Sequence, residues 1–206
     1  MSLFITFEGV EGSGKTTQIK MLNDVLILRG YKTLMTREPG GTPISDEIRR
    51  IVLNSAHSDM VPPCELFLYA ASRAQHVSQM IKPALQANKI VLCDRFTDST
   101  VAYQGYGRRL PLSIIQQLNR VASHGQVPDL TLFLDVPVAK GLAQAKAKKK
   151  RHDRLERAGA AFHGRVRAGF RQLAKKEPRR FRHILQQPTV EETQTLVRAA
   201  VDSFLR

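Results

Sequence analysis

The sequence predicts an α/β fold in which one parallel sheet of about five strands is flanked by helices. Short apolar runs typical of buried strands alternate with longer segments whose apolar residues recur at helical spacing. A glycine-rich turn lies between the first of these runs and the first helical segment. Because no internal repeat or long linker interrupts the 206 residues, we expect a single domain over 1–206.

The individual elements alternate regularly along the chain. The strands that we expect are 3–7, 32–36, 90–93, 130–134 and 181–185, of which 3–7, 90–93 and 130–134 are compact apolar runs. The helices that we expect are 15–28, 43–54, 62–86, 138–149, 158–176 and 190–204. Gly30 and Pro43 agree with these boundaries, because glycine is common just after a helix and proline in its first turn.

Composition argues against a membrane protein or a secreted one. Apolar residues make up 42% of the chain, but no run of them approaches the length that spans a bilayer. The first residues lack a cationic stretch and a cleavage site, so they predict a strand rather than a secretory signal. Cys64 and Cys93 lie far apart and form no metal-type or redox-type pair. We therefore expect a cytoplasmic protein with reduced thiols and no membrane partner.

The positive charge of the chain is concentrated in one block. Of a net +14, the segment 139–182 carries +13, since it holds sixteen lysines and arginines and three acids. Such a block suits an anionic partner, either nucleic acid or a polyphosphate. Its only aromatic residues are Phe162, Phe170 and Phe181, and no nucleic-acid-binding module is recognisable in the chain. We therefore expect most of the block to be a solvated helical surface, and we expect no nucleic-acid partner.

Residues 9–16 match the phosphate-binding pattern G-x-x-x-x-G-K-S/T at every fixed position. Glycines let the backbone curl so that successive N–H groups point at phosphate oxygens, and the following helix adds the positive end of its dipole. In such a P-loop, Lys15 reaches the β and γ phosphates of a nucleoside triphosphate and the Thr16 hydroxyl ligates Mg²⁺. The residues expected to hold this nucleotide are Gly9, Val10, Glu11, Gly12, Ser13, Gly14, Lys15, Thr16 and Thr17.

A carboxylate at the end of a buried strand is expected to complete the metal site. Asp94 follows the run 90–93, and Asp135 follows the run 130–134. Ligands of open α/β sheets bind outside the carboxyl ends of the strands, so either residue could hold Mg²⁺. We favour Asp94, because Arg95 beside it supplies a second charge directed at phosphates, whereas Asp135 could simply cap the following helix.

Seven segments of the chain carry a resemblance to a known family. They are 7–17, 36–42, 69–73, 94–96, 102–105, 128–135 and 153–156. The loop Arg37-Glu38-Pro39-Gly40-Gly41-Thr42, the pair Asp94-Arg95 and the run Tyr103-Gln104-Gly105 are far more restrictive than the P-loop itself. Together the segments resemble bacterial thymidylate kinase, a family of P-loop nucleoside monophosphate kinases, over nearly the whole chain and most strongly up to residue 136.

The resemblance implies both an architecture and a reaction. The architecture is a P-loop kinase fold with a lid over about 142–156. The reaction is transfer of a phosphoryl group from ATP to dTMP, which gives dTDP for dTTP synthesis, with Mg²⁺ as cofactor. The family is usually a homodimer, so the implied partners are ATP, dTMP and a second copy of the chain.

By resemblance, two arginines would bind the acceptor phosphate and two residues of one helix its base. Arg37 would bind the phosphate of dTMP and Arg95 would position it, and a guanidinium fork matches a phosphate better than lysine does. Tyr69 would stack on thymine and Arg73 would bond a base oxygen. These two residues are four apart, so they share one face of the predicted helix, whereas we expect Phe67 to lie in the core.

The resemblance also assigns residues to the acceptor sugar. Glu11, inside the P-loop, would engage the 3′-hydroxyl of the deoxyribose. Tyr103 would crowd the 2′ position and so favour deoxyribose over ribose. Ser99, Thr100 and Gln104 would line the same pocket. The acceptor-binding residues implied in this way are Glu11, Arg37, Tyr69, Arg73, Arg95, Ser99, Thr100, Tyr103 and Gln104.

The chain departs from the family pattern at the P-loop and in the lid. Some thymidylate kinases carry an arginine after the P-loop acid, where this chain has Gly12. The charge over the transferred phosphoryl group would then come from the lid, in which lysines replace much of the expected arginine. We expect Arg151 or Arg154 to make the catalytic contact, with Lys146 and Lys148 assisting. The catalytic residues implied are thus Lys15, Arg95, Arg151 and Arg154.

Two other functions stay open from the sequence. Another mononucleotide or deoxynucleoside kinase would share the scaffold and differ in its acceptor. A P-loop protein that binds nucleic acid would instead use the basic block, and salt-dependent retention without turnover would indicate it. For the kinase we expect direct in-line transfer without a strong general base, because the acceptor phosphate is already an anion.

Overall fold

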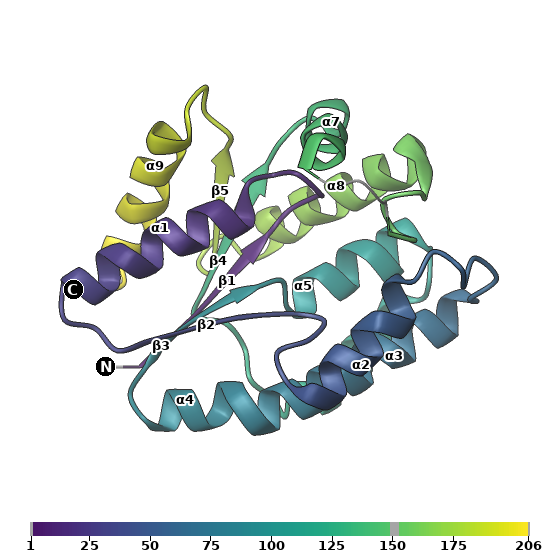
Figure 1. The fold of residues 1–206 in the computed structure, drawn as a ribbon, viewed down its shortest axis with the longest axis horizontal. Coiled ribbons are helices and arrows are strands. Elements are labelled where there is room, and N and C mark those ends of the chain that lie inside the picture. Colours follow the sequence, from purple (N-terminus) through teal and green to yellow (C-terminus); the bar gives the residue numbers. More distant parts are fainter. Residues whose placement is uncertain (1, 149–152, 206) are drawn as a thin grey trace.

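A computed structural model describes residues 2–148 and 153–205 of the chain. Its five strands form one sheet in which every neighbouring pair is parallel. The strands are β1 (Leu3–Glu8), β2 (Thr33–Arg37), β3 (Ile90–Asp94), β4 (Leu130–Asp135) and β5 (Phe181–Leu185), in the order β2-β3-β1-β4-β5. This confirms the predicted α/β class, and each strand begins and ends within one residue of its expected bounds (Figure 1).

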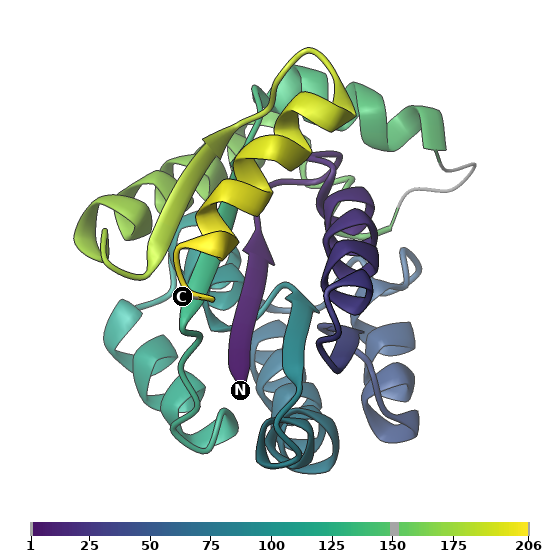
Figure 2. The same cartoon turned by 90° about the vertical axis from the view of Figure 1, so that its left-hand side faces the viewer.

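Helices cover both faces of the sheet (Figures 1 and 2). The described helices are α1 (Lys15–Leu28), α2 (Pro43–Leu53), α3 (Pro62–His76), α4 (Lys82–Gln86), α5 (Thr97–Thr100), α6 (Leu112–Ala122), α7 (Val138–Lys148), α8 (Gly159–Lys176) and α9 (Val190–Asp202). α1 and α9 pack on one face, while α4 and α8 pack on the other. None of the described helices is long and apolar enough to cross a membrane.

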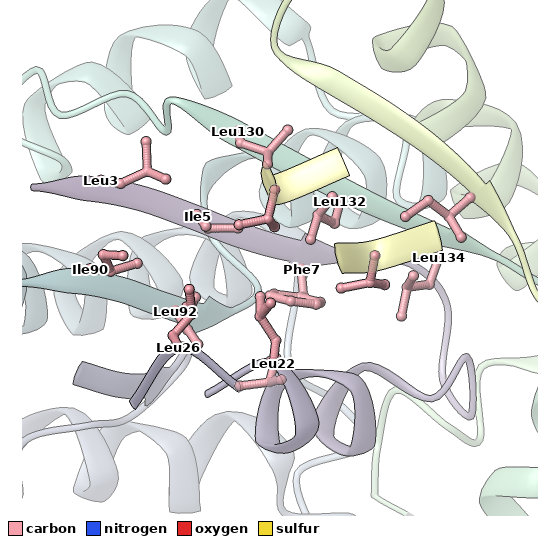
Figure 3. Packing of buried hydrophobic residues seen from close by; sticks show 14 residues of the cluster. Leu3, Ile5, Phe7, Leu22, Leu26, Ile90, Leu92, Leu130, Leu132 and Leu134 are labelled. Carbon is pink, nitrogen blue, oxygen red and sulfur yellow. The ribbon is translucent and has the colours of Figure 1, made fainter. Parts of the chain in front are cut away.

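The side chains of β1 point alternately to the two faces of the sheet, so they belong to two separate halves of the core. Leu3, Ile5 and Phe7 point toward α1, where Leu22 and Leu26 are buried against them (Figure 3). The even-numbered positions of β1 face the helices on the opposite side, as expected for a strand covered on both faces. This packing holds the central strand rigidly, so the loop that follows it starts from a fixed point.

The carboxyl ends of the strands open at one edge of the sheet. In register, Phe7 of β1 and Arg37 of β2 both lie beside Asp94 of β3. From β1 the chain continues to β2, at one edge of the sheet, whereas from β4 it continues to β5, at the opposite edge. A crevice forms outside the strand ends where the connections diverge in this way, and ligands of open α/β sheets bind there.

The predicted helix 62–86 is present but not uniform. α3 continues into a π-helical segment over Val77–Ile81 and then into α4. Pro83, in the first turn of α4, has no N–H to donate to the preceding turn, and a local π-helical spacing accommodates that lost bond. The backbone N–H of Lys82 accordingly donates to the carbonyl of Val77, five residues earlier.

Three helical elements between residues 97 and 122 were not predicted from the sequence. They are α5, a π-helical segment over Val101–Gly107, and α6. Hydroxyl residues and glycines obscure the first two, because both lower helix propensity. α6 has a readable signal, since Ile115 and Ala122 lie two turns apart on one buried face. The expectation for Phe67 was wrong: it lies on α3 but is 57% exposed.

Candidate active site

A cleft opens at the carboxyl ends of β1, β2 and β3, and almost all of the predicted site residues converge on it. Residues 11–17, from the P-loop and the first turn of α1, form one wall. The opposite wall comes from the loop after β2, from α3 and from the segment after β3. Among the residues assigned to the site from the sequence that the structure describes, those that do not line this cleft are Gly9, Val10, Arg154 and the assisting Lys146.

The Lys15 side chain folds back over the P-loop. Its ammonium donates to the carbonyl oxygens of Gly9 at 3.1 Å and Val10 at 3.0 Å, and to Ser13 Oγ at 3.3 Å. Burial and the like charge of Arg95 lower the pKa of Lys15 to about 8. Neutral partners thus hold the ammonium at the mouth of the loop, where it can exchange them for the stronger acceptors that phosphate oxygens provide.

Gly12 lies against α7. Its φ angle is +71°, in the left-handed region that favours glycine. A Cβ atom at Gly12 would lie 2.0 Å from the backbone oxygen of Gly141 in α7. The arginine that some family members carry at this position therefore has no room while α7 packs here.

Replacing Gly12 with alanine is expected to destabilise the protein more than a matched change at Gly125. Gly125 has a similar φ of +74°, but nothing lies within 4 Å of a Cβ atom there. Gly125→Ala should therefore lower the free energy of unfolding only through the strain of an alanine in the left-handed region, by about 1–2 kcal/mol. Gly12→Ala adds the clash with α7, which should lower the free energy of unfolding by about 1–3 kcal/mol more. Urea unfolding measures both losses, and equal losses in the two variants would show that α7 does not constrain the loop.

Thr16 and Asp94 lie together beside the P-loop. The Thr16 hydroxyl donates to Asp94 Oδ2 at 2.9 Å. A hydroxyl and a carboxylate are hard oxygen ligands, and Mg²⁺ commonly takes one or two such protein ligands together with water and phosphate oxygens. The two side chains therefore fit the predicted metal.

Asp135, the alternative metal ligand, is occupied elsewhere. Its carboxylate accepts hydrogen bonds from Arg167 Nε at 2.6 Å and Arg171 Nε at 2.9 Å, and His183 Nε2 lies 2.9 Å from Oδ2. Although burial works against its charge, these partners hold the pKa of Asp135 below its usual range. Asp135 does not line the cleft, so the geometry favours Asp94.

Arg95 is the centre of a buried polar cluster. Its Nη1 donates to the carbonyl oxygen of Gly9 at 2.8 Å and to Ser99 Oγ at 3.1 Å. Its Nη2 donates to Glu11 Oε1 at 3.1 Å and to the Tyr103 hydroxyl at 3.0 Å. The Tyr103 hydroxyl in turn donates to both oxygens of Glu11 at 2.8 Å. The acid of the P-loop and the arginine after β3 thus form one ion pair within the cleft.

A buried histidine completes the surroundings of Glu11. His163, on α8, is fully buried, and its Nδ1 lies 3.3 Å from Glu11 Oε2. Neither ring nitrogen makes a hydrogen bond among the described residues. Burial favours the neutral acid, but Arg95 and His163 outweigh it and hold the pKa of Glu11 below its usual range. Glu11 is therefore a carboxylate, able to accept a hydrogen bond from a sugar hydroxyl.

Two arginines share the wall after β2. Arg37 is exposed and pairs with Asp46 at 3.1 Å, while Arg49 Nη1 donates to the carbonyl of Pro39 at 2.7 Å. Burial and then the like charge of Arg37 lower the pKa of Arg49. Two cations held this close suit an anion such as a phosphate, which relieves their repulsion. Arg49 was not predicted, because nothing in the sequence of α2 places it at the cleft.

The third part of the cleft is lined by residues of α3 and of the segment after β3. Tyr69 and Arg73 both line it, one turn apart on α3. Thr100 Oγ1 is buried and has no hydrogen-bond partner among the described residues. Gln104 donates its amide N–H to Glu65 Oε1 at 2.8 Å, which fixes the orientation of its side chain. An aromatic ring, a guanidinium and two neutral polar groups thus surround one end of the cleft.

Comparison with known proteins identifies the family. The family profile described as thymidylate kinase matches residues 7–197. The thymidylate kinase of Geotalea daltonii is 53% identical over 207 residues, which cover 98% of this chain and 97% of that protein. The chain belongs to the thymidylate kinase family. It is therefore an enzyme, a transferase of the nucleotide kinase type.

Further relatives of the family agree with the fold. The thymidylate kinase of Geobacter sulfurreducens is 54% identical over 203 residues, which cover 96% of this chain and 95% of that protein. The crystal structure of thymidylate kinase from Ehrlichia chaffeensis matches with a TM-score of 0.79 at 35% identity, covering 98% of both chains. The P-loop kinase fold implied by the sequence is therefore present.

Arg154 does not lie at the P-loop in this family member. Its side chain is 8% exposed and forms an ion pair with the fully buried Glu65 of α3, which also binds Arg108. Arg154 Nε donates to the carbonyl of Val52 at 3.1 Å, and its backbone N–H donates to that of Leu53 at 3.2 Å. Arg154 thus attaches the end of the lid region to α2 and α3.

The remaining lid residues are only partly described. Arg151 and the side chain of Lys148 lie outside the described residues, as does part of the expected lid over 142–156. Lys146 is exposed on α7. Which lid cation contacts the transferred phosphoryl group therefore stays a sequence-based expectation.

Sequence reasoning missed several polar residues that hold the site residues in place. Glu38 belongs to the family-specific loop 37–42, which the sequence does reveal. Its ion pair with Arg73 was missed because the two residues lie far apart in the chain. His76 and Asn119 extend the same network, and Asn119 belongs to the unpredicted α6. A fully buried carboxylate beside a buried arginine is visible only once the helices are placed.

Proposed function

We propose that this chain transfers the γ-phosphoryl group of ATP to dTMP, giving dTDP for dTTP synthesis, with Mg²⁺ as cofactor. The observation that carries the proposal is a single cleft in which the P-loop faces both a phosphate-type wall and a base-type wall, in a thymidylate kinase family chain. Arg37 and Arg95 supply the first wall, and Tyr69 and Arg73 supply the second.

On the donor side, the P-loop holds the triphosphate and neutralises its charge. The backbone N–H groups of residues 11–17 bind phosphate oxygens, and Lys15 exchanges its carbonyl partners for the β and γ phosphates. Thr16 and Asp94 would hold Mg²⁺, which when bound neutralises charge on the phosphates. The lid that the family resemblance implies would exclude water from the site and so suppress hydrolysis of ATP.

On the acceptor side, the protein positions an oxygen that already carries negative charge. Arg37 and Arg95 hold the phosphate of dTMP in line with the γ phosphate, so that transfer needs no strong general base. Glu11 accepts a hydrogen bond from the 3′-hydroxyl, and Tyr103 closes the space beside the 2′ carbon. Tyr69 stacks on the base while Arg73 donates to one of its carbonyl oxygens.

An assay of ADP release across a panel of acceptors tests this proposal. We expect kcat/KM to be highest for dTMP and about tenfold to two-hundredfold lower for dUMP, which lacks one methyl group. dCMP, dGMP and AMP should react at least about a thousandfold less well, because their base edges leave polar groups of the site unpaired. Removal of Mg²⁺ with a chelator should stop turnover. A faster reaction with any other acceptor would identify a different nucleotide kinase.

The oligomeric state and location belong to the same proposal. Ile44, Ile51 and Phe67 are each about half exposed on the neighbouring helices α2 and α3, and a symmetric dimer would cover such apolar side chains. Sedimentation of the purified protein tests the homodimer, and a monomer with full activity would exclude it as the working form. We also propose a cytoplasmic location, where ATP and dTMP are available.

A further inference from the structure

Asn119 lies on the buried face of α6, behind the base-binding end of the cleft. Its side chain is 8% exposed, and Ile115, one turn earlier on the same face, is fully buried. A buried amide destabilises the fold unless both its oxygen and its nitrogen find partners. Asn119 has both partners, and they come from two other parts of the site.

The two partners fix the orientation of the Asn119 amide. Oδ1 accepts a hydrogen bond from Arg73 Nη1 at 2.7 Å, and Nδ2 donates to the carbonyl oxygen of Thr97 at 3.2 Å. A guanidinium can only donate and a carbonyl oxygen can only accept, so the reversed amide would lose both bonds. Asn119 therefore connects Arg73 of α3 to the backbone that follows β3.

Asn119 and Glu38 hold the Arg73 guanidinium at two different nitrogens. Nε donates to Glu38 Oε2 at 2.8 Å, and the guanidinium carbon lies 5.2 Å from the centre of the Phe96 ring. Glu38 is itself held by His76, whose Nδ1 lies 3.1 Å from Oε1. Because Glu38 already balances the charge of Arg73, a neutral acceptor at position 119 orients the guanidinium without adding a second carboxylate.

This arrangement leaves one edge of the guanidinium for a ligand. Arg73 Nη2 makes no hydrogen bond within the part of the chain that the structure describes, and Arg73 lines the cleft. Guanidinium N–H groups can pair with a carbonyl oxygen of a base but face an amino group donor to donor. The direction of Nη2 therefore decides which base edge fits.

We propose that Asn119 is a positioning residue for acceptor selection. By holding Arg73 from the α6 side, it directs the free guanidinium N–H groups at a base carbonyl, so that a 4-oxo pyrimidine is preferred over a 4-amino pyrimidine. The inference rests on the proposed function and adds to it a residue that contacts no substrate itself.

The test compares Asn119→Ala with Gln116→Ala, a change at an exposed position of the same helix. Wild-type turnover of dTMP is measured first, and its absence would overturn the proposed function itself. Loss of one hydrogen bond to a charged group should raise the KM for dTMP about tenfold to a hundredfold. kcat should change less than about threefold, and the KM for ATP should not change. The preference for dTMP over dCMP should fall about tenfold, and Gln116→Ala should match wild type in every parameter.

A double-mutant cycle with Arg73→Ala separates positioning from general stability. If Asn119 acts through Arg73, Asn119→Ala should change dTMP affinity less than about twofold in the Arg73→Ala background. An equal loss in both backgrounds would overturn the proposal. Asn119→Asp keeps an oxygen for Arg73 but loses the bond to Thr97, so it should lower Tm while it keeps the preference for dTMP. Loss of that preference in Asn119→Asp, or its retention in a folded Asn119→Ala, would also overturn it.

Discussion

Replacing Lys15 with alanine is expected to remove nearly all turnover, lowering kcat at least about a hundredfold. The ammonium sits at the mouth of the P-loop with only neutral partners, so it is free to follow the charge that develops on the transferred phosphoryl group. Lys20→Ala is the control, because Lys20 is exposed on the same helix. Single-turnover phosphoryl transfer at saturating ATP measures the effect on the chemical step.

The stability of the Lys15 variants should run opposite to their activity. The pKa of Lys15 is lowered to about 8, so the unliganded fold disfavours the charged form of this side chain. Lys15→Met, which keeps the volume without the charge, should therefore melt no lower than wild type. A Lys15 variant that retains more than about a tenth of wild-type kcat would show that another cation stabilises the transferred phosphoryl group.

Replacing Glu65 with glutamine is expected to lower the free energy of unfolding by about 3–5 kcal/mol at pH 7. Glu65 is fully buried and is the carboxylate partner of both Arg108 and Arg154, so glutamine would leave two guanidiniums without a counter-charge. Glu47→Gln is the matched control, since the side chains of Glu47 and Arg50 are 61–70% exposed in their ion pair. Its loss should lower the free energy of unfolding by less than about 1 kcal/mol. Urea unfolding measures both changes.

The effect of Glu65→Gln should also depend on pH. Burial opposes ionisation of Glu65, but Arg108, Gln104 and Arg154 outweigh it and lower its pKa from the ordinary 4.5. Because the folded pKa lies below the unfolded one, this stabilisation is complete above pH 4.5 and is lost as the pH falls through the folded value. The difference between wild type and variant should therefore shrink in acid, and a difference that stays constant would contradict the assignment.

The strands and the P-loop were predictable because their signals are local. The apolar runs of β1, β3 and β4 are buried almost throughout and allow little choice of element, and the pattern at 9–16 requires a strand before it and a helix after it. Asp94 and Asp135, by contrast, look alike in sequence, since each ends a buried strand. Only the placement of α8 and β5 shows that Asp135 is surrounded by cations.

The polar residues that support the site could not be predicted, because each acts through a partner distant in sequence. Asn119 reaches Arg73 across 46 positions, and Arg154 reaches Glu65 across 89. Helical spacing says which residues share a face but not what that face meets, which is also why Phe67 was wrongly expected in the core. Arg154 is held away from the P-loop by its ion pair with Glu65, and nothing in the sequence around Arg154 indicates that partner.

The ion pair between Glu11 and Arg95 links the two halves of the cleft thermodynamically. Glu11 belongs to the loop that would hold one substrate, and Arg95 belongs to the wall that would receive the other. An anion that draws Arg95 away changes the electrostatic field at Lys15, because Arg95 and Glu11 act on the charge of Lys15 in opposite directions. Whatever factor the first substrate imposes on the affinity of the second, the second must impose on the first. If both substrates bind as proposed, the affinity for each would therefore depend on whether the other is bound.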